Sequence, residues 1–212
     1  MSTLYNSEMT KPTTLGSRTI YNGYIFDIRV DDIRDGDIEY SREIIVHKGS
    51  AVIIPVFEDG TAALVRQYRH AAGEYLLEIP AGTLNEGEDP MIGAIRELEE
   101  EIGVHAAHVR KLSEFYVSPG FLTEKMHLYM ATGLTHVGQK LEDDEILTIE
   151  RHTFPELLEM IADGRIQDAK TIIAIQLAHG APAPHGTPAP HGTPAPHGTP
   201  APLPGTQASS HA

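Results

Sequence analysis

Cysteine and tryptophan are both absent from this chain of 212 residues, and basic residues are scarce. The lack of cysteine excludes disulfides, thiolate catalysis and zinc sites built on cysteine. Lys and Arg together number 16 against 30 Asp and Glu, which leaves a net charge of −14 at pH 7. Non-specific nucleic-acid binding needs a basic surface, so we expect no nucleic-acid partner. A phosphorylated substrate is still compatible with this charge, because bound cations can neutralise it.

Long hydrophobic runs are missing as well. Residues 1–20 contain no apolar stretch that would serve as a signal peptide. No segment approaches the roughly 18–20 apolar residues of a membrane span. We therefore expect no membrane partner and a cytoplasmic location. Apolar residues still make up 41% of the chain, which is enough for the core of one domain.

The C-terminal segment 179–212 repeats the hexapeptide HGTPAP. Proline at every second or third position removes amide donors and blocks helix formation, and almost nothing apolar is available to bury. We predict a disordered tail with polyproline-II character. Weak metal chelation by the histidines of this tail is the less favoured alternative, because these histidines are spread along a mobile chain.

Short apolar runs separated by turn residues fill the rest of the chain. The runs that predict strands are 19–33, 38–49, 51–70 (two strands joined at Glu58-Asp59-Gly60), 75–82, 111–119, 125–134 and 146–154. The segments that predict helices are 90–102, a second from about Phe154, and a third after Asp168. This mixture predicts an α/β domain around a mixed sheet.

These patterns divide the chain into four parts. Residues 1–17 are expected to be flexible, and residues 18–48 to form a small N-terminal β-subdomain whose strands meet at the turn Asp35-Gly36-Asp37. Residues 49–178 are expected to form the main domain, and residues 179–212 the tail.

The helix over 90–102 carries clear start and stop signals. Asp89 is the expected N-cap, Pro90 suits the first helical position, and Gly103 is a suitable stop. On a helical wheel the apolar residues fall on one stripe, which we expect to face the core: Met91, Ile95, Leu98 and Ile102.

Three acidic residues of this helix converge on one face. Glu97 and Glu101 lie one turn apart and Glu100 extends their face, whereas Glu99 falls on the opposite flank of the apolar stripe. Two carboxylates about 4 Å apart repel by roughly 4 kcal/mol at an effective dielectric constant of about 20. Arg96 relieves part of this repulsion, and Mg²⁺ or Mn²⁺ would relieve more. The helix alone leaves two interpretations open, a solvated acidic face and a metal site.

The residues around the helix follow a wider spacing. Five residues separate Gly82 from Glu88, and seven more lead to Arg96-Glu97, after which the pattern runs to Gly103 and Val104. This spacing resembles the Nudix box without a departure, and the resemblance covers roughly residues 20–178. It implies a Nudix-type α/β/α sandwich around a mixed sheet, with the N-terminal β-subdomain as a dimerisation element.

The resemblance also implies roles in catalysis and metal binding. Glu97 and Glu101 would be the main ligands of Mg²⁺, or of Mn²⁺, and Glu100 would assist. The backbone carbonyl of Ala81 would complete the metal site.

The other residues of the box have structural explanations. Gly82 permits a tight backbone turn between strand and loop. Glu88 lies just before the helix, where it can bind free amides or Arg96. Arg96 is expected to be structural, and Gly103 to end the helix.

A second motif narrows the subgroup. Pro119 follows Val104 by fifteen residues, within Ser-Pro-Gly, and Glu124 comes shortly after. This loop is similar to that of ADP-ribose pyrophosphatases, which implies that Pro119 and Gly120 contact the substrate and that Glu124 is the general base. An ordinary turn is the alternative, because Pro-Gly is a common turn pair.

Substrate recognition is expected from two further regions. Arg69, at a strand end, matches a substrate-contacting arginine of that subgroup, and a guanidinium suits a diphosphate. Glu78 orients a water or this arginine, or is a buried structural acid. Tyr40 aligns best with the aromatic residue that stacks on adenine in relatives, with Tyr21 and Tyr24 as competitors and packing against the sheet as the alternative.

The expected function is metal-dependent hydrolysis of ADP-ribose, or of a similar nucleotide diphosphate derivative, by a homodimer. The products would be AMP and ribose 5-phosphate. The alternatives are a Nudix hydrolase for GDP-mannose, a dinucleotide polyphosphate or flavin adenine dinucleotide, and a non-catalytic Nudix-like nucleotide sensor.

Overall fold

The computed structural model describes residues 10–141, 145–180 and 187–188. The strands are β1 (Thr13–Asn22), β2 (Asp27–Asp35), β3 (Ile38–Val46), β4 (Ser50–Pro55), β5 (Thr61–Arg69), β6 (Glu74–Glu78), β7 (Ala81–Thr83), β8 (Val104–Tyr116), β9 (Lys125–His136), β10 (Leu147–Thr153) and β11 (Thr187–Pro188). The helices are α1 (Pro90–Glu97), the π-helical turn η1 (Leu98–Ile102), α2 (Phe154–Ala162) and α3 (Ala169–His179).

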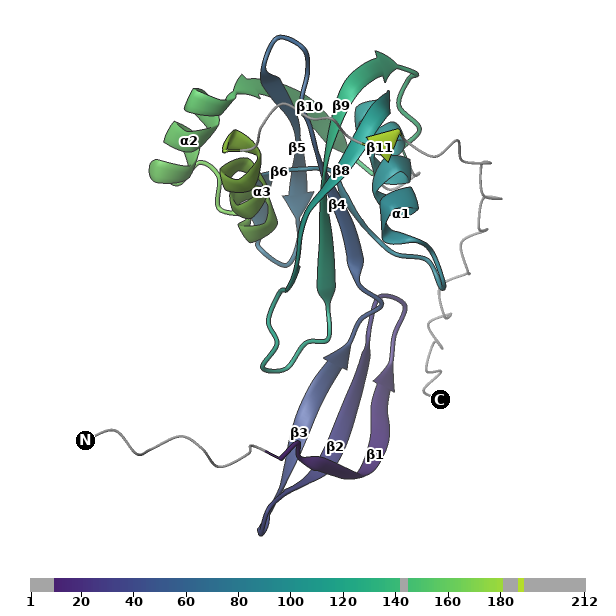
Figure 1. Cartoon of the computed structure of the whole chain (residues 1–212). Coiled ribbons are helices and arrows are strands. Elements are labelled where there is room, and N and C mark those ends of the chain that lie inside the picture. The colour runs from purple at the N-terminus through teal and green to yellow at the C-terminus, as the bar shows by residue number, and fades with distance from the viewer. Residues whose placement is uncertain (1–9, 142–144, 181–186, 189–212) are drawn as a thin grey trace, which may run out of the picture.

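The main body contains two sheets (Figure 1). The larger has the strand order β11-β8-β9-β4-β7, and the smaller has the order β10-β5-β6. Strands β4 and β9 run parallel, whereas the other neighbours run antiparallel, so the larger sheet is mixed as predicted. The two strands expected over 51–70 are β4 and β5, and they belong to different sheets.

Successive residues of β4 point to opposite sides and build two cores. Ala51 and Ile53 pack with the buried side chains of α1 and η1. Val52 and Ile54 pack with those of α2 and α3. This alternation follows from the two-residue period of a strand and leaves the sheets between two helical layers. The predicted α/β/α sandwich is confirmed.

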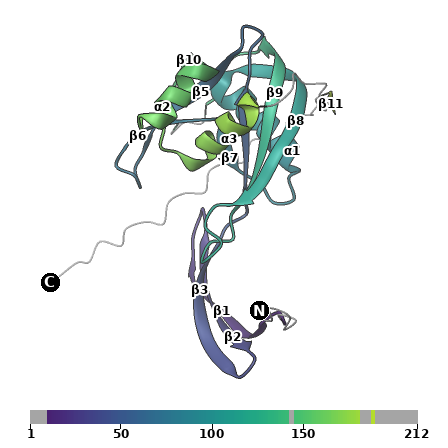
Figure 2. The same ribbon diagram turned by 60° about the vertical axis from the view of Figure 1, so that its left-hand side comes forward.

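The small sheet β1-β2-β3 projects from one end of this body (Figures 1 and 2). The continuous strand predicted over 19–33 is wrong, because the chain turns after Asn22 and begins a new strand at Asp27. The Asp27 side chain closes that turn by accepting hydrogen bonds from Asn22 Nδ2 (2.7 Å) and from the amide of Gly23 (3.2 Å).

The limits of the predicted N-terminal parts also change. Strand β1 starts at Thr13, so residues 13–17 are paired with β2 and are not the flexible segment that was expected. Pairing supplies these residues with backbone partners that the sequence pattern did not indicate. Residues 1–9, where the rest of that expectation falls, lie outside the described residues.

The C-terminal boundary moves in the same way. Helix α3 continues to His179, one residue beyond the predicted limit of 178. Within the repeat tail, Thr187 and Pro188 pair antiparallel with Val109 and His108 at the edge of β8, so this piece is not disordered. An unpaired strand edge offers free backbone groups to such a segment. The other residues of the tail lie outside the described part of the chain.

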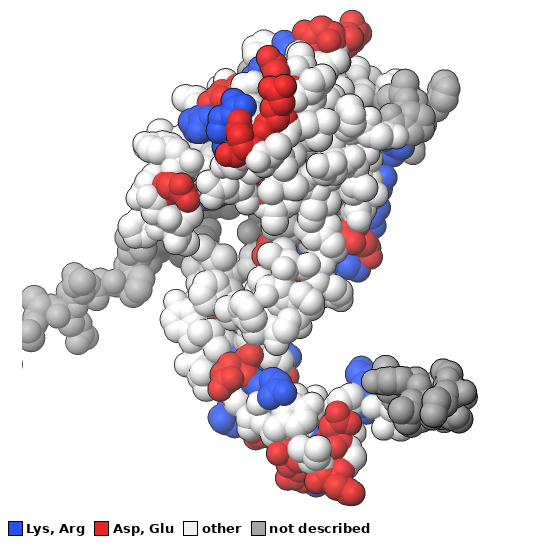
Figure 3. Space-filling view, turned by 90° about the vertical axis from the view of Figure 1, so that its left-hand side faces the viewer, with Lys and Arg blue, Asp and Glu red and all other residues white. Residues whose placement is uncertain are grey.

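The charge distribution agrees with the composition. On the face shown in Figure 3, Lys and Arg lie among Asp and Glu and do not gather in one basic patch. In the part of the chain that the structure describes, no helix has the length and apolar character needed to cross a membrane.

Candidate active site

The helix that carries the acidic residues begins where the sequence predicts. Asp89 caps α1 by accepting from the amides of Met91 (2.8 Å) and Ile92 (3.3 Å), and Pro90 occupies the first turn. Gly103 ends the helical stretch with a left-handed φ of 72°. These are the start and stop signals expected from the sequence.

The second half of the predicted helix differs from expectation. Residues Leu98–Ile102 form a π-helical turn, so a wheel of uniform α-helical pitch does not describe them. Leu98 and Ile102 are buried in the core as predicted, whereas Met91 is only partly buried. The π-helical turn also buries Glu101, which is 4% exposed.

Strand β7 makes an unusually close contact with Glu97. Gly82 pairs with Ala51 inside the sheet, and a Cβ atom added to it would stand 1.8 Å from Oε1 of Glu97. Its φ angle lies outside the left-handed region. The glycine is therefore required for close approach of the carboxylate, not for the tight turn that was expected.

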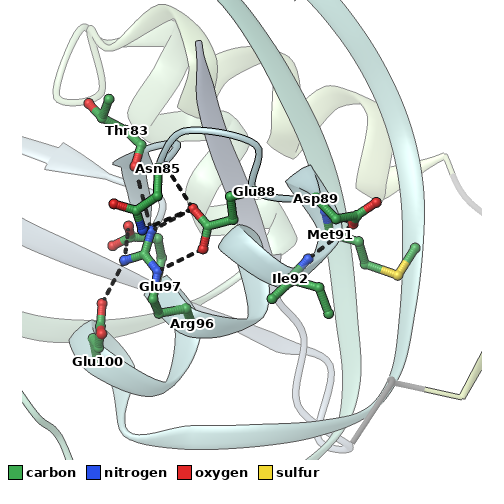
Figure 4. A network of polar contacts seen from close by, with 9 residues as sticks. All are labelled: Thr83, Asn85, Glu88, Asp89, Met91, Ile92, Arg96, Glu97 and Glu100. Atoms are coloured by element: carbon green, nitrogen blue, oxygen red, sulfur yellow. Dashed lines mark hydrogen bonds and ion pairs between the residues drawn. The ribbon is translucent and has the colours of Figure 1, made fainter. Parts of the chain in front are cut away.

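Arg96 connects three of the acidic residues (Figure 4). Its Nε donates to Glu88 Oε1 at 3.1 Å, and its Nη1 donates to Glu97 Oε1 at 2.6 Å and to Glu100 Oε2 at 2.9 Å. Glu88 also accepts from the amide of Asn85 at 2.9 Å, which ties the loop before α1 to the helix. These contacts agree with the predicted structural positions of Arg96 and Glu88.

Burial strongly perturbs the two inner carboxyl groups. Glu97 is 6% exposed, and burial raises its pKa to about 7 in spite of Arg96. Burial, together with the neighbouring charges of Glu97 and Glu145, raises the pKa of Glu101 to about 9. Among the described residues, Glu101 Oε2 has no hydrogen-bond partner. A nearby positive charge would stabilise the ionised form of both groups.

The donors present suit a hard divalent cation. Carboxylate oxygens are the ligands that Mg²⁺ and Mn²⁺ prefer, and Glu101 keeps one such oxygen free of any described partner. Within the described ranges, no group of three or more His, Asp or Glu side chains is placed to hold a metal by itself. Glu97 and Glu100 instead point to Arg96, so the ligand set stays a prediction. Glu99 lies apart as predicted, 2.7 Å from His105 Nδ1.

Arg69 lies at the end of β5 with its guanidinium held by Glu78. Nε donates to Oε1 at 2.7 Å and Nη2 donates to Oε2 at 2.9 Å. The Arg69 side chain is 42% exposed, whereas that of Glu78 is only 2% exposed. Burial alone would raise the pKa of Glu78, but its cationic partners outweigh burial and lower it. Of the roles considered for Glu78, the structure supports orienting the arginine from a buried position.

Glu124 lies just before β9, beside Ser50, the first residue of β4, and His47 of the β3–β4 connection. Ser50 Oγ donates to Glu124 Oε1 at 2.6 Å. His47 Nδ1 approaches the same oxygen at 3.8 Å, but it already accepts from the amide of Gly49 at 3.0 Å. A nitrogen that accepts a hydrogen bond carries no proton, so this approach is not an ion pair.

The loop that contains Pro119 and Gly120 is exposed and is tied to the end of β3. The amide of Ile45 donates to the carbonyl of Phe121 at 2.7 Å, and the amide of Thr123 donates to the carbonyl of Ile45 at 2.9 Å. This clamp places the loop at the junction between the small sheet and the body.

Tyr40 is not brought to the carboxylates of its own chain. It is partly buried on β3 in the projecting sheet, with the Arg42 guanidinium 4.3 Å from its ring centroid. Its competitors Tyr21 and Tyr24 lie in the same N-terminal region and are 52% and 91% exposed.

Two residues that hold the site together were missed by the sequence interpretation. Ser50 opens an apolar strand, and Lys170 lies in the first turn of α3. Neither belongs to a motif, and each meets its partner only through tertiary contact.

A family model for the NUDIX domain matches residues 47–174. The methanol dehydrogenase activator of Bacillus methanolicus is 38% identical over 166 residues, which cover 77% of this chain and 90% of that protein. The ADP-ribose pyrophosphatase of Bacillus subtilis (strain 168) is 36% identical with the same coverage of both chains.

The fold has a solved counterpart. The crystal structure of an ADP compounds hydrolase superposes with a TM-score of 0.73 at 22% identity and covers 82% of this chain and 95% of the other. With the complete box on β7, α1 and η1, these matches show that the chain belongs to the Nudix family.

Proposed function

We propose that this protein hydrolyses the diphosphate of ADP-ribose and related ADP-sugars, and that ADP-ribose yields AMP and ribose 5-phosphate. The observation that carries the proposal is the pair of buried carboxyl groups of Glu97 and Glu101, whose pKa values are both raised by burial. Glu97 lies directly against Gly82 of β7. The likeness to a Bacillus ADP-ribose pyrophosphatase supports the choice of substrate.

A divalent cation belongs to this reaction, with Mg²⁺ preferred and Mn²⁺ as the second choice. Glu97 and Glu101 would hold it, assisted by Glu100 and by the carbonyl of Ala81. The bound cation would neutralise the diphosphate and lower the pKa of a bound water. The acidic protein then needs no extended basic surface for an anionic substrate.

The chain's own residues bind the substrate and move a proton. Arg69 presents its exposed guanidinium to the diphosphate while Glu78 holds its other edge. Glu124, held by Ser50, accepts a proton from the attacking water. The water oxygen bonds to one phosphorus, the bridging P–O bond breaks, and the second phosphate leaves with the bond's electron pair. Pro119 and Gly120 border the substrate in the loop before Glu124.

We also propose a homodimer in which the N-terminal sheet carries the contact. This sheet exposes several large apolar side chains, including Ile20 (58% exposed), Ile25 (60%) and Ile38 (67%). Ile20 lies on β1, Ile25 in the turn before β2 and Ile38 at the start of β3, and exposed apolar side chains of this size are common at protein interfaces. The partner's copy of the sheet would then bring an aromatic side chain, Tyr40 in this assignment, to the adenine.

The test is product identification. Purified protein is incubated with ADP-ribose, with and without Mg²⁺, and the products are separated by chromatography. AMP and ribose 5-phosphate formed only with the cation are expected. GDP-mannose, diadenosine polyphosphates and flavin adenine dinucleotide serve as competing substrates. A clear preference for one of them would overturn the choice of ADP-ribose, and no turnover of any would favour a nucleotide sensor.

A further inference from the structure

A buried charged cluster lies behind the site, and one of its members, Lys170, has no part in the chemistry described so far. Lys170, in the first turn of α3, is 8% exposed. Its Nζ contacts Glu78 Oε2 and lies 3.0 Å from Asp168 Oδ1. A buried ammonium is costly unless it is paired, so this placement requires both carboxylates.

The cluster continues from Lys170 to the surface. Glu78 Oε2 receives Lys170 on one side and Arg69 Nη2 on the other, at 2.9 Å, while Oε1 receives Arg69 Nε at 2.7 Å. Glu78 therefore lies between two cations, one sealed inside and one 42% exposed at the site. Glu78 raises the pKa of Arg69 most, and the charge of Glu101 raises it to a smaller extent.

Lys170 restricts how Glu78 can move. A carboxylate held only by Arg69 could rotate together with that side chain, since both ends of the pair would be free to shift. A third contact from α3 fixes the plane of the carboxylate, and the plane in turn fixes the fork of the guanidinium. Restricting a side chain before the substrate arrives reduces the entropy lost on binding.

We propose that Lys170 is a positioning residue that sets the orientation of Arg69 through Glu78, and this inference rests on the proposed function. Lys170 itself does not reach the substrate, because its side chain is 9% exposed and both of its contacts point inward. Its effect on the reaction passes through Arg69 alone.

A purely structural lysine makes a different prediction. Lys170 would then only compensate the buried charge of Glu78 and anchor α3. Its loss would lower the stability of the fold without raising KM more than it lowers kcat. A double-mutant cycle separates the two explanations, because it measures whether Lys170 still matters when Arg69 is absent.

The experiment measures kcat and KM for ADP-ribose in Lys170→Met, made in the wild-type chain and in Arg69→Ala. In the wild-type chain we expect KM to rise about tenfold with little change in kcat, because Lys170 and Arg69 act in one network that binds the substrate. In Arg69→Ala, Lys170→Met should cause no further loss. Lys170→Arg, which keeps the charge, should restore most of the affinity. Where Lys170→Met does not fold, Lys170→Gln takes its place.

Thr153→Ala is the matched control. Thr153 caps α2, the helix that packs beside α3, by accepting from the amide of Glu156 at 3.4 Å. This variant should lower the melting temperature and leave KM unchanged. Titration of ADP-ribose in EDTA, where no turnover occurs, gives a second measure of affinity for every variant.

The outcomes separate this inference from the proposed function. A wild-type protein that neither hydrolyses nor binds ADP-ribose contradicts the proposed function. A wild-type protein that turns over ADP-ribose, but loses the same factor from Lys170→Met with and without Arg69, overturns the positioning role. An unchanged KM in folded Lys170→Met also overturns it.

Discussion

Glu101 keeps one carboxylate oxygen buried without a hydrogen-bond donor among the described residues. Such a group costs free energy in the folded state, because it has lost its water and gained no partner. Natural proteins retain this kind of cost mainly at functional sites. The residue expected to bind metal is therefore also one that weakens the metal-free fold.

Replacing Glu101 by Gln should abolish most turnover with Mg²⁺ and leave the protein folded. It should also change how stability depends on pH. Because the pKa of about 9 lies above the ordinary 4.5, the folded state binds this proton more tightly than the unfolded state. The resulting stability is present below pH 4.5 and is lost as the pH rises towards 9.

Thermal unfolding in EDTA at pH 5 and pH 9 measures this effect. The melting temperature of the wild type should fall more between these values than that of Glu101→Gln. Glu99→Gln is the control, since Glu99 pairs with His105 away from the inner carboxyl groups. Equal falls for all three proteins would contradict the raised pKa of Glu101. Near wild-type rates for Glu101→Gln with saturating Mg²⁺ would remove the metal-ligand role.

Gly82→Ala tests the close approach of β7 to Glu97. The new Cβ would lie 1.8 Å from the carboxylate, so Glu97 must leave its position. We expect kcat to drop at least about tenfold while stability changes by about 1–3 kcal/mol, the usual cost of overpacking. Gly16→Ala, at a position of β1 where φ lies outside the left-handed region and an added Cβ meets nothing within 4 Å, should leave kcat unchanged. Normal turnover in Gly82→Ala would show that Glu97 is not needed where it stands.

Glu124→Gln tests the general base. The amide keeps the shape of the side chain but accepts no proton, so kcat should fall more than KM rises. Initial rates across substrate concentrations at fixed Mg²⁺ give both constants. An unchanged kcat would exclude Glu124 as the base.

At the scale of elements, the turn after η1 holds the acidic segment against the sheet. Gly103 has a φ of 72°, and an added Cβ would stand 2.6 Å from the backbone nitrogen of Gln139. The left-handed backbone alone costs an L-residue about 1–2 kcal/mol. The contact with Gln139 adds to this cost, and a shift of η1 would move Glu101 with it.

Gly103→Ala should therefore lose more than about 1 kcal/mol of unfolding free energy and also lose activity. Urea denaturation and kcat, measured on the same preparation, check both effects. Asp89→Ala is the comparison, because it removes only the cap of α1 and should cost about 1 kcal/mol. Full activity in a destabilised Gly103→Ala would mean that the position of η1 does not matter for turnover.

The elements themselves were largely predictable from local patterns. The cap at Asp89 and the stop at Gly103 are encoded within a few residues, and the structure confirms them. The π-helical turn was not predictable, since the periodicity of 90–102 also fits a regular α-helix. The break between β1 and β2 was missed for another reason, because Asn22-Gly23, a common hairpin turn pair, was read as part of one long strand.

At the scale of the whole molecule, the projecting N-terminal sheet exposes every residue of β1. A three-stranded sheet with so little packing against its own body gains stability from a second surface. The clamp between β3 and the loop before Glu124 would connect such an interface to the site.

Ile20→Asp should convert a dimer into monomers, because a charge cannot be buried unpaired at an apolar contact. Sedimentation velocity on the wild type and the variant measures the change. Thr13→Asp, at the other end of the same exposed strand, is the control and should remain dimeric. A monomeric wild type would contradict the proposed homodimer.

The sequence by itself determined the family, the acidic helix with its caps, and the separation of Glu99 from the other acids. These features depend on spacing along the chain, which local geometry converts directly into a face or a turn. Only the tertiary structure decided which carboxyl groups are buried, and how Arg69 and Glu124 are held. Lys170 meets Glu78 across 92 residues, and Ser50 meets Glu124 across 74. Such pairs depend on how helices and strands pack, and packing has no signature at either position alone.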